Sequence, residues 1–310
     1  MRVLSLATNG RSRFYRQQVE RLRDRGHAVD MMVIPQSDSG ESRSVAAYAR
    51  YYVRALAAAP RGYDVVHANY GLTAPPAVVQ PFAPTVVSLW GSDLMGRYGS
   101  VSRTACRFAD AVVVMSEEMS ALAGLECHVI PHGVNMDLFR PLPRDFARSE
   151  VGWAPDRRHV LFPYSRDRAV KDFPRARRIV DAVDETVERP VELHTINGVP
   201  HDRMPLYFNA ADALLLTSRR EGSPNAVKEA LACDCPVVAT DVGDVADRLD
   251  GVSNTAVGDD DDELARRLAA ILASGARPDG HASVAPLGID RQIDKLVDVY
   301  RSVADAPDQK

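Results

Sequence analysis

Residues 211–249 read ADALLLTSRREGSPNAVKEALACDCPVVATDVGDVADRL. The apolar run at 213–216 has the length of a buried strand; a polar turn, a stretch with helical spacing and a second apolar run at 236–239 follow it. A strand, a helix and a strand in this order form a βαβ unit, in which the two strands run parallel. The stretch therefore predicts a parallel sheet of the α/β class.

The same alternation extends along most of the 310 residues. In the first half we expect strands at 3–7, 28–34, 64–68, 85–89, 111–115 and 128–130, and helices at 13–25, 43–59 and 116–123. In the second half we expect strands at 160–163, 191–196, 213–216, 236–239 and 255–257, and helices at 172–186, 204–211, 224–233, 261–273 and 289–303. Pro, Gly and Asn interrupt the pattern at 131–157, which predicts a linker. We therefore predict two doubly wound domains that face each other across a cleft.

Charge is unevenly distributed along the chain. The net charge is −4, but residues 1–150 have a balance of +3 and the remainder has a balance of −7.

No apolar run approaches the roughly 20 residues of a membrane span. The first residues, MRVLSLATNGRSRF, place arginines after the apolar run, the reverse of a secretory signal, so a cytoplasmic protein is expected. Cys233-Asp234-Cys235 is too tight for zinc-site spacing and no second pair follows it, so no metal site is expected.

The turn at 221–225 has the residues of a helix N-terminus that could face a ligand. Ser223 suits the N-cap position, and Pro224 suits the first helical turn. Asn225 then offers free backbone N–H groups at the positive end of the helix dipole, which suits a phosphate or diphosphate. In a parallel sheet this end of the helix lies at the carboxyl edge of the strands, where ligands bind.

Two glutamates flank that turn. Glu229 follows Glu221 by about two helical turns, so both can face the same side. A carboxylate there could accept hydrogen bonds from vicinal hydroxyls, such as those of a ribose. A capped surface helix with solvent-facing Glu229 and Lys228 is the alternative, and the turn by itself does not separate the two.

The flanks of the turn resemble the donor-binding segment of glycosyltransferase family 4, whose members are retaining enzymes of the GT-B fold. The family's pattern is a strand, Glu-Gly-x-Pro/Ser, a second Glu eight residues after the first, a small-residue run, Pro-Val-Val and a Gly-rich turn. Glu221, Glu229, the run at 236–238 and Gly243 match this pattern in order. The match spans much of the quoted stretch.

Two further segments are similar to the same family. LFPYSRDRAVKDF at 161–173 places Arg166 after a strand and Lys171 five residues later, at the spacing of the family's diphosphate-binding pair. VIPHGVNMDLFRP at 129–141 resembles the interdomain segment, to which we assign hinge and packing roles.

The resemblance implies a GT-B fold with three parts. These are an acceptor-side Rossmann-like domain at 1–145, a donor-binding Rossmann-like domain at 146–285, and a C-terminal helix within 286–310 that packs back on the first domain. It also implies retaining transfer of a sugar from a nucleotide-diphosphate-sugar to a hydroxyl acceptor, with no metal or other cofactor. A glycan or a lipid-linked molecule is the expected acceptor, and no nucleic acid is expected as a partner.

The resemblance also implies roles for individual residues. The expected catalytic residues are Glu221, Arg166 and Lys171. The expected donor-binding residues are Gly10, Gly222, Ser223, Pro224, Asn225 and Glu229.

Trp90 departs from the family's pattern, because it stands in LWGSD where many members have His. An indole cannot exchange protons, so a role of that His would be vacant or moved to Asp93 or His67. These three residues are the acceptor-side candidates. The departure keeps two alternatives open: a non-catalytic nucleotide-sugar-binding or scaffold protein, and a GT-B nucleotide-sugar epimerase.

Arginines are frequent on the helices expected in the first half. Arg43, Arg50 and Arg54 share one face of the helix at 43–59. A basic first domain could make a peripheral contact with anionic lipid at the inner face of a membrane, or bind a lipid-diphosphate acceptor. Solvated helix faces are the alternative.

Overall fold

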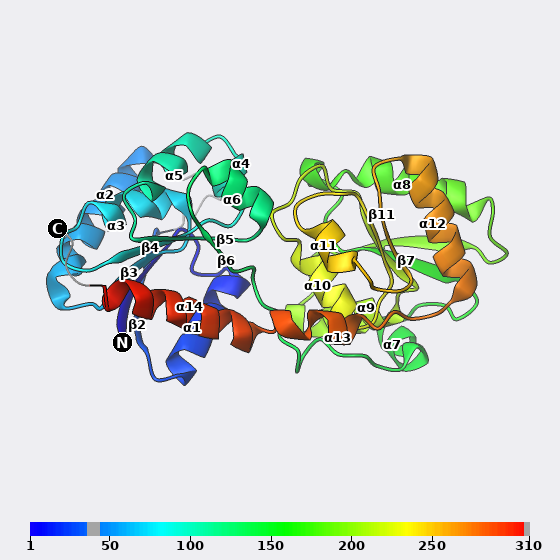
Figure 1. Ribbon diagram of the computed structural model, residues 1–310. Helices are drawn as coiled ribbons and strands as arrows, with labels where there is room; N and C mark the ends of the chain where they lie inside the picture. The colour runs from blue at the N-terminus through cyan, green and yellow to red at the C-terminus, as the bar shows by residue number, and fades with distance from the viewer. Residues whose placement is uncertain (36–43, 307–310) are drawn as a thin grey trace. The chain divides into compact units, whose positions relative to one another are not determined.

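The computed structural model describes residues 1–35 and 44–306, which form two compact units (Figure 1). Unit 1 combines Met1–His132 with Ile289–Lys310, and unit 2 is Gly133–Gly288. The two divisions predicted from the sequence fall after residue 145 and after residue 285. Arg43, one of the basic residues discussed above, lies outside the described residues.

Over the described residues, unit 1 is built on six parallel strands in the order β2-β1-β3-β4-β5-β6. The strands are β1 (Arg2–Ala7), β2 (Ala28–Val33), β3 (Val65–Ala68), β4 (Thr85–Ser88), β5 (Ala111–Val114) and β6 (His128–Val129). The helices are α1 (Arg13–Asp24), α2 (Val45–Ala58), α3 (Ala74–Val78), α4 (Ser92–Met95), α5 (Gly99–Cys106), α6 (Glu117–Ala123) and α14 (Ile289–Ala304), with 3₁₀ turns η1 (Ala59–Arg61) and η2 (Gly71–Thr73). The central strands β3, β4 and β5 are buried at every position, because a parallel sheet is covered on both faces.

The last helix of the chain belongs to unit 1. Helix α14 packs against α1 and β3, and its Ile293 and Tyr300 are fully buried. The Tyr300 hydroxyl lies 2.6 Å from Nδ1 of His67 on β3. Arg25, just after α1, forms ion pairs with Asp290 (2.9 Å) and Asp294 (3.1 Å) of α14. The prediction that the C-terminal helix contacts the N-terminal region is confirmed.

Over the described residues, unit 2 is built on five parallel strands in the order β11-β10-β9-β7-β8. The strands are β7 (Arg158–Phe162), β8 (Val191–Thr195), β9 (Ala213–Leu216), β10 (Val237–Ala239) and β11 (Thr255–Val257). The helices are α7 (Arg144–Val151), α8 (Phe173–Asp184), α9 (Met204–Ala210), α10 (Asn225–Ala232), α11 (Val245–Leu249), α12 (Asp261–Ser274) and α13 (Gly280–Val284), with 3₁₀ turns η3 (Ala169–Lys171), η4 (His201–Arg203) and η5 (Ala285–Leu287).

Strand β9 shows how the sheet of unit 2 divides its core. Leu214 and Leu216 belong to a buried cluster on one face of the sheet, with Leu231 of α10. Ala213 and Leu215 belong to a second cluster on the other face, with Leu268 of α12. Successive side chains of a strand point to opposite faces, so an uninterrupted apolar run is what a strand between two helix layers requires. The predicted parallel α/β class is confirmed.

Helix α7 forms inside the segment in which the sequence analysis expected a linker. Its sequence, RDFARSEV, buries only Ala147 and the arginine Arg148, so it has no apolar period to mark it as a helix. The Arg148 guanidinium is held instead by Asp212 at 2.6 Å and by the Ala210 carbonyl at 3.1 Å. A buried ion pair therefore replaces the usual apolar stripe.

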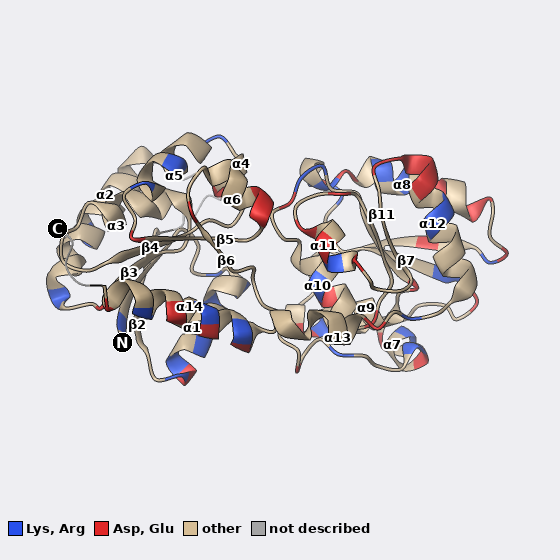
Figure 2. Ribbon diagram, in the orientation of Figure 1, with Lys and Arg blue, Asp and Glu red and all other residues tan. Residues whose placement is uncertain are grey.

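The run of aspartates at 259–262 begins α12. The Asp260 side chain accepts a hydrogen bond from the Glu263 N–H (2.8 Å), as an N-cap residue does. Arg175 and Arg178 of α8 contact Asp261 at 2.5 and 3.3 Å, and the ribbon in Figure 2 is coloured for basic residues on α8 and for acidic residues at the start of α12. The run of aspartates therefore caps the N-terminus of α12.

Among the helices in the described part of the chain, none has the length and apolar content that crossing a bilayer requires.

Candidate functional site

The loops that follow two neighbouring strands of unit 2 meet at Lys171 and Glu221. Strand β7 pairs with β9, so both loops leave the carboxyl edge of the sheet side by side. The Lys171 ammonium contacts Oε1 of Glu221, and the Ser218 hydroxyl donates to the same oxygen at 2.7 Å. Nζ of Lys171 also lies 3.9 Å from the centre of the Tyr164 ring. The structure thus brings together two of the three expected catalytic residues.

Backbone and side-chain hydrogen bonds fix these two loops to each other. The Thr217 hydroxyl lies 3.0 Å from the carbonyl oxygens of both Lys171 and Asp172. The Arg219 N–H donates to the Val170 carbonyl at 2.9 Å. Thr217 is fully buried, so few other conformations are open to this junction.

Burial shapes the electrostatics of the lysine. Only 4% of Lys171 is exposed, and desolvation lowers its pKa from the ordinary value, while the Glu221 carboxylate acts in the opposite direction. Glu221 keeps 15% of its side chain exposed. The pair therefore places a cation and a hydrogen-bond acceptor at a partly open position.

Helix α10 begins at Asn225, with Pro224 in the N-cap position. Among the described residues no side chain caps this helix, so the expectation that Ser223 is the N-cap is wrong. The Ser223 hydroxyl is engaged elsewhere, because it contacts Asp244 at 2.8 Å and Nζ of Lys228 at 3.0 Å. The uncapped N-terminus of α10 leaves backbone donors at the positive end of the helix dipole.

The turn before α10 is closely packed against the turn after β10. A Cβ on Gly243 would lie 2.5 Å from the Gly222 carbonyl oxygen, and the φ of Gly243 is +63°, so this position requires glycine. Asp244, the next residue, receives hydrogen bonds from Ser223 and from Arg248 (2.9 Å). The second turn therefore holds the first in place.

Glu229 is 7% exposed and faces a residue that the sequence analysis did not connect with it. Its Oε1 lies 3.0 Å from Nε2 of His201 in η4. The His201 ring packs against Phe139, with ring centres 4.8 Å apart. Nothing in the spacing links His201 to Glu229, because η4 and α10 come together only in the folded unit.

Arg166 lies on the loop after β7, at the surface of unit 2. Its side chain is exposed, and its guanidinium lies 5.0 Å from the centre of the Phe173 ring. Its Nε lies 3.4 Å from the Thr195 hydroxyl at the end of β8. Arg166 thus stands at the carboxyl edge, as expected, with a side chain that solvent reaches.

The acceptor-side candidates lie in unit 1, and two of them have internal roles. Asp93 is 1% exposed, and its carboxylate accepts the N–H groups of Trp90, Gly91 and Gly71 at 2.9 Å each. His67 is fully buried between Tyr300 and Ser88 (2.7 Å), and burial lowers its pKa to about 3. Both side chains are buried in unit 1, so the structure does not favour an acceptor-side role for either, and that role stays a prediction.

The other two candidates of unit 1 remain partly exposed. Trp90 packs edge-on against His132, with ring centres 4.8 Å apart. Gly10 follows β1, and a Cβ there would lie 2.9 Å from a methyl group of Val33. Gly10 thus permits close packing against β2.

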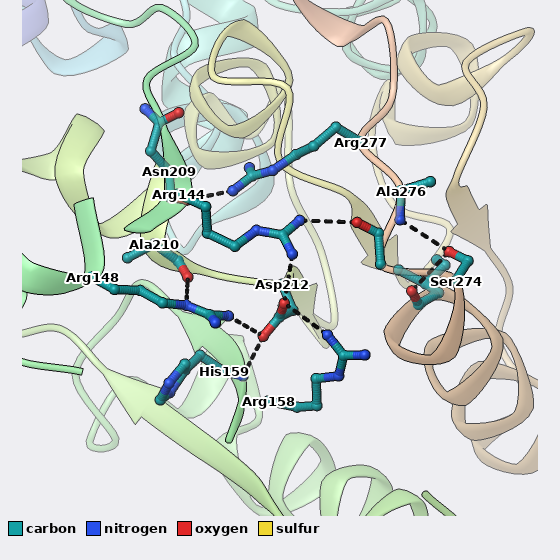
Figure 3. A network of polar contacts seen from close by, with 12 residues as sticks. Arg144, Arg148, Arg158, His159, Asn209, Ala210, Asp212, Ser274, Ala276 and Arg277 are labelled. Carbon is teal, nitrogen blue, oxygen red and sulfur yellow. Dashed lines mark hydrogen bonds and ion pairs between the residues drawn. The ribbon is translucent and has the colours of Figure 1, made fainter. Parts of the chain in front are cut away.

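A polar network around Asp212, which the sequence analysis missed, lies at the other end of the unit 2 strands (Figure 3). The buried carboxylate forms ion pairs with Arg148 at 2.6 Å, Arg144 at 3.2 Å and Arg158 at 3.6 Å. It also accepts the backbone N–H of His159 at 2.7 Å. Because Asp212 precedes β9 and His159 lies early in β7, this network fixes the amino ends of both strands.

The two parallel sheets and the returning helix define the GT-B fold. A sucrose-phosphate synthase from Thermosynechococcus elongatus has this arrangement, with a TM-score of 0.81, 18% identity and coverage of 99% of this chain and 100% of that one. Anabaena Alr3699/HepE in complex with UDP-glucose matches with a TM-score of 0.68, 16% identity and coverage of 97% and 100%.

The profile described as "Glycosyl transferases group 1" matches residues 174–274, which lie in unit 2. A putative teichuronic acid biosynthesis glycosyltransferase, TuaC of Bacillus subtilis, is 28% identical over 212 residues, which are 59% of this chain and 54% of that protein. D-inositol 3-phosphate glycosyltransferase 1 of Catenulispora acidiphila is 27% identical over 308 residues, 79% of this chain and 73% of that protein. The chain thus matches only about half the length of TuaC.

Proposed function

We propose that this chain is a retaining glycosyltransferase that moves a sugar from a nucleotide-diphosphate-sugar to a hydroxyl acceptor. The observation that carries the proposal is the contact between Lys171 and Glu221 at the carboxyl edge of the unit 2 sheet. It joins two loops that match the family's donor-binding segments, beside an uncapped helix N-terminus.

In this proposal, unit 2 holds the donor. Lys171, Arg166 and the N-terminus of α10 neutralise the charge that develops on the leaving diphosphate, as preorganised donors do in a desolvated site. Glu221 orients Lys171 and accepts hydrogen bonds from the sugar hydroxyls. Glu229, oriented by His201, accepts hydrogen bonds from the ribose hydroxyls.

In the bond-making and bond-breaking step, the protein supplies charge stabilisation and no group that accepts the proton. The bond between the anomeric carbon and the diphosphate oxygen breaks, and the acceptor oxygen attacks from the same face of the sugar. The leaving diphosphate takes the proton of the acceptor hydroxyl. Charge stabilisation comes from Lys171, Arg166 and backbone N–H groups, so we propose a metal-independent reaction.

The acceptor side is assigned to unit 1, with Trp90 as its accessible candidate. The relatives act in teichuronic acid biosynthesis or on inositol 3-phosphate by their names, which supports a polyhydroxylated acceptor for this chain too. A hexosyl donor and a glycan or lipid-linked acceptor are part of this proposal, as is a peripheral membrane contact through the arginines of α1 and α2.

Turnover assays test the proposal directly. The purified chain is incubated with a panel of nucleotide-sugars, with and without polyol and glycan acceptors, and released nucleoside diphosphate and sugar products are measured. Lys171→Ala and Glu229→Ala should each lower turnover by at least about 100-fold, because each removes a charged contact to the donor. Lys295→Ala, on an exposed face of α14, is the matched control and should leave turnover unchanged.

The outcomes separate the alternatives. Donor binding without any product would favour a scaffold protein, and an isomerised donor in the absence of acceptor would favour an epimerase. Full turnover in both Lys171→Ala and Glu229→Ala would overturn the site assignment.

A further inference from the structure

Two histidines and a glutamate cluster on the sheet of unit 2, away from the donor loops. His159 is on β7, and Glu192 and His194 are on β8, the edge strand. In the register of this parallel pair, His159 lies opposite Glu192 and Leu161 lies opposite His194. Glu192 and His194 are two residues apart, so their side chains share one face of the sheet.

The three ligand atoms lie within reach of a single ion. Nδ1 of His159 is 2.8 Å from Nε2 of His194. Oε2 of Glu192 is 3.7 Å from the first nitrogen and 3.5 Å from the second. A point about 2 Å from all three atoms exists within this triangle, and that is the length of zinc–nitrogen and zinc–oxygen bonds.

The surroundings orient each ligand. Nε2 of His159 lies 2.7 Å from the Ala154 carbonyl oxygen, so it is protonated and leaves Nδ1 as the acceptor. Arg157 holds Oε1 of Glu192 at 2.9 Å, and Oε2 is the oxygen that faces the histidines. Fixed partners of this kind are typical of metal-binding histidines and carboxylates.

The indole of Trp153 lies over both imidazoles. The Trp153 ring stacks on His194 at 3.8 Å and on His159 at 4.9 Å between ring centres. The indole covers the pair without contributing a competing donor or acceptor to it.

We infer that His159, Glu192 and His194 form a binding site for a divalent first-row transition ion, with zinc as the representative. Two imidazole nitrogens and one carboxylate oxygen are a donor set that such ions accept, and water completes the coordination. Without an ion, Nε2–H of His194 donates to Nδ1 of His159. Binding requires that proton to move to Nδ1 of His194, whose side chain is 20% exposed.

The position of the site indicates a stabilising role. Glu192 and His159 are the second residues of their strands, whereas Lys171 and Glu221 follow the carboxyl ends. The ion would join edge strand β8 to β7, beside the Asp212 network that holds the His159 N–H. It would therefore strengthen unit 2 and take no part in sugar transfer.

Calorimetric titration of the full chain with Zn²⁺ tests this inference. The chain should bind one equivalent, and its thermal unfolding temperature should rise with Zn²⁺ because the ion binds the folded state. His194→Ala and Glu192→Gln should each weaken binding by at least 10-fold and abolish the thermal shift. Glu188→Gln and His128→Gln, both exposed, are matched controls and should bind as the wild type does.

Co²⁺ identifies the ligands. The Co²⁺ complex should show weak d–d absorption without an intense thiolate charge-transfer band, since the three ligands are nitrogen and oxygen. An intense thiolate band at one equivalent would assign the ion to cysteine and overturn the inference. Absence of stoichiometric Zn²⁺ binding, or unchanged binding in both His194→Ala and Glu192→Gln, would overturn it equally.

Discussion

Lys228 is a fully buried lysine next to the proposed donor site. Its Nζ lies 3.0 Å from the Ser223 hydroxyl, which in turn contacts Asp244. Desolvation lowers the Lys228 pKa from 10.5 to about 8, and Asp244 and Glu229 oppose this effect. The ammonium is thus retained at a cost in stability, in a position where it holds the serine of the turn before α10.

This cost should appear in the pH dependence of unfolding. The folded pKa is below the unfolded one, so the unfolded chain binds more protons between about pH 8 and 10.5, and the Lys228 contribution to stability rises across that window. Relative to Lys228→Met, the wild type should gain up to about 3 kcal/mol from pH 8 to 10.5. Urea denaturation at several pH values measures this difference. Parallel stability curves for the two proteins would contradict the assignment, and Lys295→Met serves as the exposed control.

At the scale of elements, the site is a junction of two loops that Thr217 fixes. Its hydroxyl contacts two carbonyl oxygens of the loop after β7, although Thr217 itself directly follows β9. The loop carrying Lys171 therefore takes its position from the strand that precedes Glu221. The geometry of the pair depends on this hydroxyl as much as on the two charged residues.

Thr217→Val tests the junction, because valine keeps the shape and removes the hydroxyl. Buried carbonyls that lose a donor should cost about 1–3 kcal/mol of the free energy of unfolding. The proposed turnover should also fall, because Lys171 loses its fixed position. Denaturant titration and donor kinetics measure the two effects. Unchanged stability and unchanged kinetics together would show that the Thr217 hydroxyl neither stabilises the junction nor positions Lys171.

The sequence predicted most elements closely and the site only partly. Strands such as 213–216 were placed correctly because apolar runs between two helix layers are unmistakable, whereas α7 was missed because its buried side chain is Arg148. The resemblance to the family's diphosphate-binding pair predicted that Arg166 and Lys171 both follow β7 at the carboxyl edge of the sheet. The contact of Glu229 with His201 was not predicted, and neither was the loss of Ser223 as a cap, because both depend on partners distant in the chain.

At the scale of the whole molecule, the two units have separate cores, and the ends of the chain both belong to unit 1. Helix α14 closes that core through Ile293, Leu296 and Tyr300. A substitution in the core of one unit should therefore lower the stability of that unit and leave the stability of the other unchanged. This matters for interpreting variants, since a loss of stability in one unit need not alter the site in the other.

Tyr300→Phe is a local test of this separation. It removes the hydroxyl that lies 2.6 Å from the buried His67, which should destabilise unit 1 by about 1–3 kcal/mol. Hydrogen exchange followed by peptide mapping should show faster exchange in β3 and α14 and unchanged exchange in β9 and α10. Faster exchange throughout unit 2 would contradict independent cores.

The central claim is that the loops after β7 and β9 bind the diphosphate of a nucleotide-sugar. Calorimetric titration of the full chain with a nucleotide-sugar panel that includes UDP-glucose tests it most directly. We expect at least one donor to bind with one-to-one stoichiometry, Lys171→Ala to weaken this binding by at least about 10-fold, and Lys295→Ala to leave it unchanged. A panel without any binding, or equal affinity in the wild type and Lys171→Ala, would contradict it.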